Sequence, residues 1–160
     1  MADDAETRTD KEEQPQGVPK CEFETKRLVL RLDTTIEGKK DAIPPVVEGV
    51  MQLVRMMGCA AGRETQVEIA LTEALANAVV HGCKNDPNKK VECCVACDED
   101  RGMLIVIRDP GEGFDPTKIA SPIVGQNLFE THGRGIFLIN QLVDEVRYEK
   151  GGTEIHMRIR

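Results

Sequence analysis

The sequence of 160 residues contains no tryptophan, one tyrosine and four phenylalanines. A core built from this chain must therefore rest on aliphatic side chains and methionine rather than on aromatic rings. No run of about 18 or more apolar residues occurs, which argues against a transmembrane helix. An excess of positive charge is also missing, since the formal net charge is −7. Direct binding to nucleic acid depends on neutralising phosphates, so this acidic chain fits a protein partner with a basic surface better.

The first residues lack the apolar core of a signal peptide. Met1–Lys20 is instead rich in Asp, Glu, Thr and Gln, a composition typical of disordered segments. The remaining length suits one domain. We expect a disordered acidic tail over residues 1–22, a single domain over residues 23–160, and a cytoplasmic protein without membrane attachment.

The six cysteines include a C-x-x-C pattern within Cys93-Cys94-Val-Ala-Cys97. Such a pattern can indicate zinc binding or redox chemistry. The run is β-prone, however, and in a strand Cys94 and Cys97 point to opposite faces. No second pair of ligands lies nearby in the sequence. We therefore predict buried, reduced thiols that act as small hydrophobic side chains.

Hydrophobic periodicity predicts alternating strands and helices. The result is an α/β (α+β) two-layer sandwich, in which helices cover one face of a mixed, mostly antiparallel sheet. The expected strands are 26–32, 90–97, 103–108, 145–148 and 153–160, the expected helices are 46–57, 63–81 and 135–143, and polar turn signals cover 34–40.

The most informative segment is Leu71-Thr-Glu-Ala-Leu-Ala-Asn-Ala-Val-Val-His-Gly82. Glu73 and Asn77 lie four residues apart, which places them on one face of a helix. A glutamate can accept a proton or orient a water, and an asparagine offers a neutral oxygen to a hard cation such as Mg²⁺. By itself the pair also fits the polar edge of an amphipathic helix.

Three glycine-containing motifs follow in the chain. Asp109 ends a buried strand and stands beside Gly111 and Gly113, so its carboxylate could accept a hydrogen bond while the glycines let a flat ring approach. Glycines in Thr131-His-Gly-Arg-Gly135 come just before an expected helix, whose N-terminus attracts phosphate. Gly151-Gly-Thr153 separates two expected strands. Each motif alone is also compatible with an ordinary turn.

In this order and spacing the four motifs resemble those of the Bergerat-fold ATPases, the superfamily that includes DNA gyrase and the histidine kinases. Glu73–Asn77 resembles their N box, Asp109–Gly113 their D-x-G-x-G box, Gly133–Gly135 their G-x-G box and Gly152–Thr153 their final Gly-Thr. Within the superfamily, the helix Leu71–Gly82 is very similar to that of the bacterial anti-sigma factor serine/threonine kinases. The resemblance covers about residues 27–160.

This resemblance implies a phosphoryl-transfer site with ATP and Mg²⁺ as cofactors. Asn77 would coordinate Mg²⁺, and Glu73 would be the general base that draws a proton from a serine hydroxyl or a water. Backbone N–H groups near Gly133 and Gly135 would hold the phosphates, and Arg134 would add positive charge beside them.

The same resemblance implies an adenine site. Asp109 would accept a hydrogen bond from the adenine amine, Gly111 and Gly113 would belong to the same box, and Thr153 would support the ring together with a water. For His81, one turn beyond Asn77, a nucleotide contact and a role in capping the helix remain equally open. The segment 115–132, which has little periodicity, would be the ATP lid.

The resemblance further implies an anti-sigma factor that sequesters a sigma factor, phosphorylates a small antagonist protein on serine, and is expected to form a homodimer, as the family tends to do. The alternative is a non-catalytic module that binds nucleotide and sequesters a partner. A sensor histidine kinase is disfavoured because no histidine precedes His81, and a gyrase-like clamp is disfavoured because it needs further domains.

Overall fold

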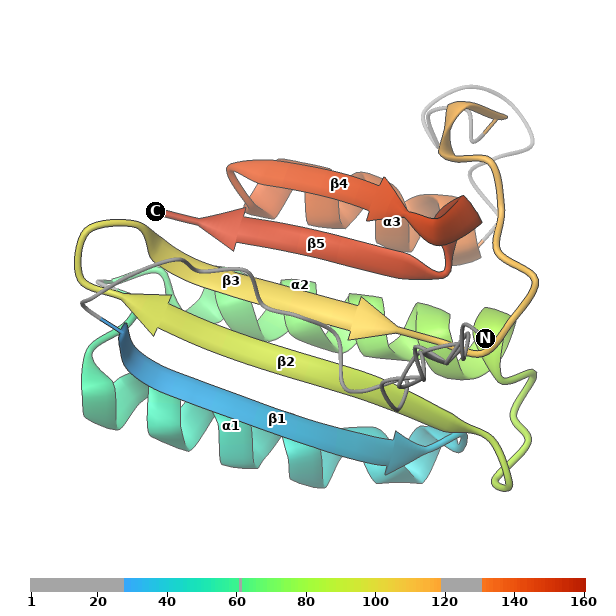
Figure 1. Ribbon diagram of the computed structural model, residues 1–160, viewed down its shortest axis with the longest axis horizontal. Coiled ribbons are helices and arrows are strands. Elements are labelled where there is room, and N and C mark those ends of the chain that lie inside the picture. The colour runs from blue at the N-terminus through green and yellow to red at the C-terminus, as the bar shows by residue number, and fades with distance from the viewer. Residues whose placement is uncertain (1–27, 61, 119–130) are drawn as a thin grey trace, which may run out of the picture.

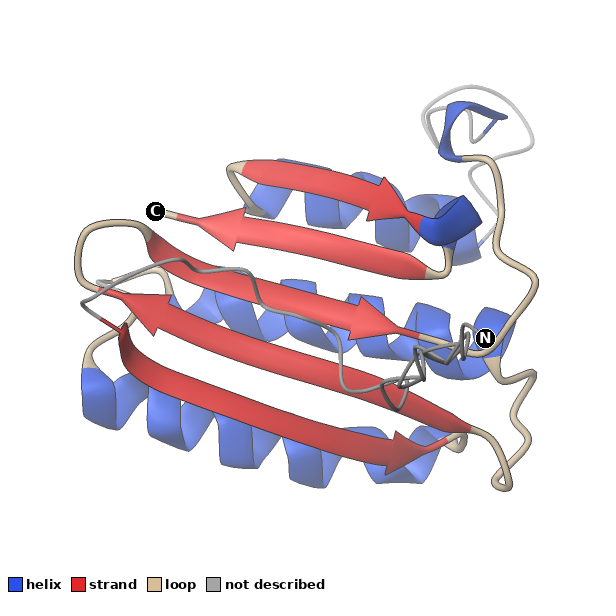
Figure 2. Ribbon diagram, viewed as in Figure 1, coloured by secondary structure: helices blue, strands red, loops and turns tan. Residues whose placement is uncertain are grey.

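The computed structural model describes residues 28–60, 62–118 and 131–160. Five strands form one sheet in the order β1-β2-β3-β5-β4, and three α-helices cover one of its faces (Figure 1, Figure 2). The predicted two-layer α/β sandwich is thereby confirmed. The strands are β1 Leu28–Glu37, β2 Lys90–Asp98, β3 Gly102–Arg108, β4 Glu145–Glu149 and β5 Glu154–Ile159, and the helices are α1 Ile43–Met57, α2 Glu64–Asn77 and α3 Thr131–Leu142.

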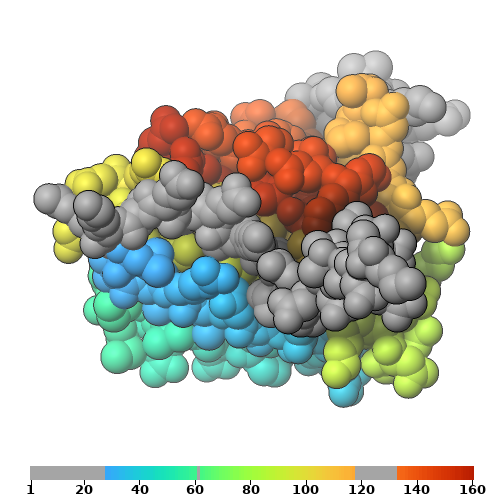
Figure 3. All heavy atoms as spheres, in the orientation of Figure 1, coloured from blue at the N-terminus to red at the C-terminus, as the bar shows by residue number. Residues whose placement is uncertain are grey.

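All four strand pairings are antiparallel, whereas the sequence predicted a mixed, mostly antiparallel sheet. Hairpins join β2 to β3 and β4 to β5, and such short connections can only produce antiparallel neighbours. β5 then pairs with β3, so the last hairpin extends the sheet beyond β3. β1 and the last hairpin consequently lie at opposite edges of the sheet (Figure 3).

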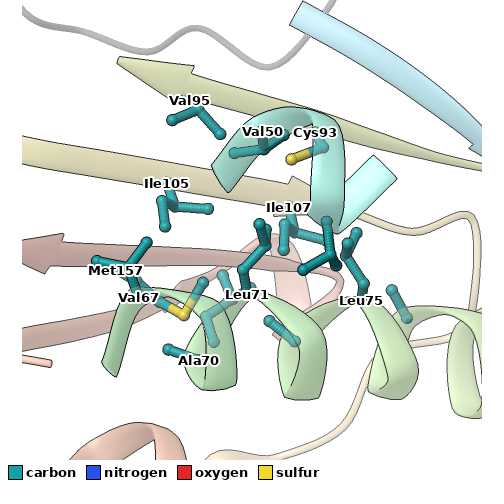
Figure 4. Close-up of a cluster of buried hydrophobic side chains, with 14 of the residues drawn as sticks. Val50, Val67, Ala70, Leu71, Leu75, Cys93, Val95, Ile105, Ile107 and Met157 are labelled. Carbon is teal, nitrogen blue, oxygen red and sulfur yellow. The ribbon is translucent and has the colours of Figure 1, made fainter. Parts of the chain in front are cut away.

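The core lies between the sheet and helix α2. Val67, Leu71 and Leu75 of this helix are completely buried against the inner face of the sheet, where Ile105 and Met157 are also buried (Figure 4). Helix α1 adds further apolar side chains from its own inner face. Removing such aliphatic side chains from water is the main stabilising contribution, as a chain with few aromatics requires.

Two predicted boundaries in the N-terminal part of the domain need correction. β1 continues to Glu37 instead of ending before Thr34, because its pairing with β2 extends to Lys90 and the ladder outweighs the polar turn signals. Helix α1 begins at Ile43, not Val46, since prolines are tolerated in the first helical turn. Its predicted end at residue 57 is confirmed, and Gly58 closes the helix with a left-handed φ of 66°.

The cysteines of β2 alternate as predicted, with Cys94 and Cys97 on opposite faces of the sheet, but not all of them are free thiols. Cys93 and Cys97 are buried, free thiols in the main core, and burial raises the pKa of each to about 12. Cys94 belongs to a separate small cluster with Ala96, Leu104 and Val106. It is disulfide-bonded, so the prediction of reduced thiols throughout is wrong for Cys94. Its side chain lies on the sheet face opposite the helices. The spacing of cysteines within one strand carries no information about a disulfide partner from another part of the chain.

Over the described ranges no helix is long and apolar enough to cross a membrane. The predicted tail over residues 1–22 lies outside the described residues.

Candidate functional site

A cavity of about 270 Å³ opens between the end of α2 and the adjoining ends of β3, β4 and β5. Its lining includes six residues of the motifs that the sequence analysis selected: Asn77, His81, Asp109, Gly113, Gly152 and Thr153. Apolar side chains of Ile107, Ile136 and Ile155 line it as well. A largely apolar cavity with a few converging polar groups is the usual form of a small-molecule site.

Asp109 follows β3 and is held in place by backbone hydrogen bonds. Its own N–H donates to the carbonyl oxygen of Thr153 at 2.9 Å, and its Oδ1 accepts from the Gly111 N–H at 2.8 Å. Burial raises the pKa of the Asp109 carboxyl, while the hydrogen bond from Gly111 opposes this shift. The result is an oriented, partly desolvated acceptor at the cavity wall, as an adenine amine would require.

The D-x-G-x-G box (Asp109–Gly113) and the turn Gly151–Thr153 form one continuous wall of the cavity. Gly113 has a φ of 78°, and the neighbouring Phe114 N–H donates to the Gly151 carbonyl at 2.9 Å. A Cβ on Gly113 would overlap the Gly151 carbonyl oxygen and lie 3.3 Å from the Thr153 methyl group. Only glycine fits at position 113, which explains why the two motifs can lie so close together.

Thr153 contributes to the wall with its side chain already oriented. Its hydroxyl donates to the Lys150 carbonyl oxygen at 2.9 Å. The proton is therefore used within the turn, and the lone pairs of the hydroxyl oxygen are what it can offer to a ligand or water.

Glu73 and Asn77 meet helix α3 at Gly135. A Cβ on Gly135 would lie 2.9 Å from Glu73 Oε2 and 3.3 Å from both Asn77 Oδ1 and Nδ2. The absence of a side chain at 135 therefore lets α3 approach the carboxylate and the amide directly. Asn77 lines the cavity, whereas Glu73 lies beside it and does not belong to the lining.

The second glycine motif is placed differently from the prediction. Helix α3 begins at Thr131, so Gly133 and Gly135 lie within its first turns and not in a loop before it. Gly133 still occupies the first turn, where backbone N–H groups have no acceptor within the helix and the dipole favours an anion. Arg134 is exposed, and neither it nor the two glycines lines the cavity. The predicted lid, residues 115–132, lies mostly outside the described residues.

The end of the N-box helix also differs from the prediction. The α-helix stops at Asn77 and continues as a π-helical turn over Ala78–Gly82, in which the Cys83 N–H donates to the Ala78 carbonyl at 2.8 Å. A glycine at the end of a helix often closes it in a left-handed conformation, but Gly82 is the last residue of this wide turn and has no positive φ. Such π-turns are frequent at functional sites.

His81 occupies the same π-turn, and its side chain lines the cavity. Partial burial lowers the pKa of the imidazole, which favours its neutral form. The place of His81 in the lining puts the imidazole within reach of a ligand in the cavity.

Sequence reasoning missed the aromatic part of the cavity. The rings of Phe114 and Tyr148 meet edge to face, with centroids 5.4 Å apart and an interplanar angle of 72°. Both residues line the cavity. Tyr148 is the only tyrosine of the chain, but nothing in its spacing connects it to the four motifs.

A second group of potential metal ligands lies on β4 and β5. Glu149, Glu154 and His156 bring three ligand atoms within 4.8 Å of one another. Arg108 Nε and Lys150 Nζ already lie 2.7 and 3.4 Å from Glu154 Oε2. Burial raises the pKa of Glu154, but the hydrogen bonds from Arg108 and His156 outweigh it and the pKa is lowered. The cluster is thus an ion-pair network whose central carboxylate is already neutralised.

Fold and cavity together define an α/β domain with a small-molecule site, and comparison with known proteins identifies its family. The profile of the histidine kinase-like ATPase domain matches residues 36–159. The chain therefore belongs to the histidine kinase-like ATPase domain family.

Curated relatives carry two kinds of name. The serine-protein kinase RsbW of Staphylococcus epidermidis is 37% identical over 98 residues, which cover 56% of this chain and 61% of that protein. The anti-sigma F factor of Geobacillus stearothermophilus is 30% identical over 99 residues, covering 59% of this chain and 67% of the relative. The serine-protein kinase RsbW of Bacillus subtilis is 30% identical over 125 residues, which cover 71% of this chain and 77% of that protein. The matched part of this chain spans about three fifths of the first of these relatives.

Proposed function

We propose that this protein is an ATP-dependent protein serine kinase that acts as an anti-sigma factor. In this proposal it sequesters a sigma factor and phosphorylates a small anti-sigma-factor antagonist protein on serine. The observation that carries the proposal is the packing of Gly135 against Glu73 and Asn77 beside the cavity that contains Asp109. The names of the relatives support the same reading.

The cavity supplies the groups for adenine recognition. Asp109, oriented by the Gly111 N–H, accepts a hydrogen bond from the adenine amine. The apolar side chains of Ile107, Ile136 and Ile155 surround a flat ring and exclude water from it. Gly113 and Thr153 shape the wall beside the ring.

Asn77 and the first turn of α3, on the side of the cavity away from Asp109 in this proposal, fit a Mg²⁺ ion and a triphosphate. Asn77 offers a neutral amide oxygen to the cation, which would neutralise charge on the triphosphate oxygens. The first turn of α3 directs backbone N–H groups toward anions.

Glu73 is proposed as the general base. As it takes the proton of the substrate serine, the serine oxygen forms a bond to the γ-phosphorus. The bond between that phosphorus and the β,γ-bridging oxygen breaks, and ADP leaves with the electron pair.

The remaining assignments extend this proposal. An acidic tail over residues 1–22 precedes one domain over residues 23–160, the location is cytoplasmic, and a homodimer is the expected assembly. The net charge of −7 favours protein partners with basic surfaces and disfavours direct contact with nucleic acid.

One observation favours a second candidate, a non-catalytic nucleotide-binding module that only sequesters its partner. Glu73 lies beside the cavity and not on its lining. In that case ATP would control partner binding without phosphate transfer.

Phosphate transfer distinguishes the two functions. Proteins captured from the native cell by the parent protein are incubated with it and with ATP labelled in the γ-phosphate, and phosphoserine is identified by mass spectrometry. A labelled serine in a captured protein that stays unlabelled with Glu73→Ala supports the kinase. Stable capture of a sigma factor without any label supports the binding module and contradicts the kinase.

A further inference from the structure

The hydroxyl group of Tyr148 is buried and has no hydrogen-bond partner among the described residues. A buried hydroxyl normally has a partner, and its absence costs stability that the surrounding structure must offset. Tyr148 lines the cavity proposed for adenine. Since no described residue supplies a partner, a ligand bound in this cavity is the candidate.

The tyrosine ring is held firmly in this position. Tyr148 is on β4, where its backbone pairs with Ile155 of β5. Its ring packs edge to face on Phe114, whose N–H is itself bonded to the Gly151 carbonyl. Because both the strand and the ring contact fix the side chain, the hydroxyl cannot easily turn outward to water.

The hydroxyl remains protonated near neutral pH. Burial raises the pKa of Tyr148 to about 12. The group can therefore donate a hydrogen bond as well as accept one. Of the groups that adenine presents, the ring nitrogens N1, N3 and N7 are acceptors, and Asp109 is already assigned to the amine.

We propose that the Tyr148 hydroxyl donates a hydrogen bond to a ring nitrogen of the bound adenine and so helps to select the base. This inference rests on the proposed function, because it requires that the cavity holds an adenine nucleotide. Tyr148 and Asp109 would then read the ring through two complementary contacts, one donating and one accepting. A base that lacks either the amine or the acceptor nitrogen would lose one of these two hydrogen bonds.

Tyr148→Phe tests this proposal because it removes only the hydroxyl and keeps the ring against Phe114. ATP affinity is measured by calorimetry, and thermal unfolding is followed without nucleotide. We expect ATP to bind about 3- to 10-fold more weakly, the range for one neutral hydrogen bond. The nucleotide-free variant should unfold at the same temperature as the parent or higher, since a buried hydroxyl without a partner has been removed.

Thr35→Val is a matched control. It removes an exposed hydroxyl from β1, outside the cavity lining, and introduces a residue that strands favour. ATP affinity of this variant should equal that of the parent. If Tyr148→Phe binds ATP as the parent does, or loses affinity only together with thermal stability, the proposed contact is wrong.

Analogues of ATP identify the acceptor. The affinity ratio between the parent and Tyr148→Phe is measured with 1-deaza-, 3-deaza- and 7-deaza-ATP, each of which lacks one ring nitrogen. The ratio should fall to about one for the analogue that lacks the partner of Tyr148, as in a double-mutant cycle. An unchanged ratio for all three analogues would overturn the assignment to a ring nitrogen. Failure of the parent itself to bind ATP would instead refute the proposed function.

Discussion

Gly82 lies directly against the side chain of Asp109. A Cβ built on Gly82 would overlap the carboxyl carbon and Oδ1 of Asp109, and one on Gly111 would lie 2.8 Å from the Gly82 Cα. The π-helical turn over Ala78–Gly82 brings the glycine to this place. The end of the N-box helix and the D-x-G-x-G box (Asp109–Gly113) are thus in direct contact. The orientation of Asp109 depends on the absence of a side chain at position 82.

Gly82→Ala should weaken ATP binding by about 10- to 100-fold, comparable to the loss of a hydrogen bond to a charged group. The added methyl group must displace the Asp109 carboxylate from its position. Calorimetry with ATP and with inosine triphosphate measures the effect, and the preference for ATP should shrink because inosine lacks the amine.

Gly49→Ala is the control for this substitution. Gly49 is an exposed residue of α1, and a Cβ there would meet no atom within 4 Å. The alanine should raise stability by up to about 1 kcal/mol through helix propensity and leave ATP affinity unchanged. Equal ATP affinity of Gly82→Ala and the parent would show that Asp109 tolerates the methyl group.

Asp109→Asn should cost about 1.5–3 kcal/mol of ATP-binding free energy, because the charge-assisted acceptor is replaced by an amide. Burial already raises the pKa of Asp109, so the ionised form carries a desolvation cost in the absence of ligand. Thermal unfolding without nucleotide should therefore change little or shift upward. An affinity equal to that of the parent would place the adenine elsewhere.

Glu73→Ala should spare ATP binding and lower phosphate transfer by about 10²–10⁴-fold, the usual range for a general base. Asn77→Ala should instead weaken nucleotide binding only when Mg²⁺ is present. ATP affinity with and without Mg²⁺ and single-turnover transfer to the substrate protein are measured for both variants. Transfer at the parent rate by Glu73→Ala would rule out Glu73 as the base.

Arg63 should contribute about 1.5–3 kcal/mol to folding stability. Its guanidinium donates to Asp144 Oδ2 at 2.7 Å and to the carbonyl oxygens of Leu142 and Arg160 at 3.1 Å each. It therefore joins the start of α2 to the end of α3 and to the last strand. Chemical denaturation of Arg63→Ala measures the loss.

Arg55→Ala is the matched comparison for Arg63→Ala. The Arg55–Glu68 pair is 3.2 Å long, and its side chains are 54% and 48% exposed. Such a surface pair is worth less than about 1 kcal/mol. Equal losses for the two arginines would contradict the role assigned to Arg63.

The same contact predicts a pH dependence. The Arg160 backbone N–H and the Arg63 guanidinium lower the pKa of Asp144. A carboxyl with a lowered folded-state pKa stabilises the fold fully above its unfolded pKa of about 3.9 and loses this contribution as the pH falls through the folded value. The stability difference between the parent and Asp144→Asn should be fully present at about pH 6 and shrink progressively as the pH falls below the unfolded value of about 3.9, as measured by denaturation at each pH. A constant difference would contradict the assignment.

Much of the fold could be predicted from local patterns. The spacing of Glu73 and Asn77 on one helical face and the β2–β3 hairpin depend on residues close in sequence, and periodicity reports such relations directly. Boundaries were less accurate where a ladder or a packed helix outweighs local preference, as at Glu37 and Ile43.

The sequence by itself determined which groups are available: a carboxylate and an amide one turn apart, an aspartate at a strand end, and glycines at the turns. Only the tertiary structure decided that Gly82 lies against Asp109, that Gly135 lies against Glu73, and that Tyr148 completes the cavity. These contacts join elements that are far apart in the chain. They depend on how helices pack on the sheet and on an unexpected π-turn, and no periodicity in one strand or helix encodes the distance to another.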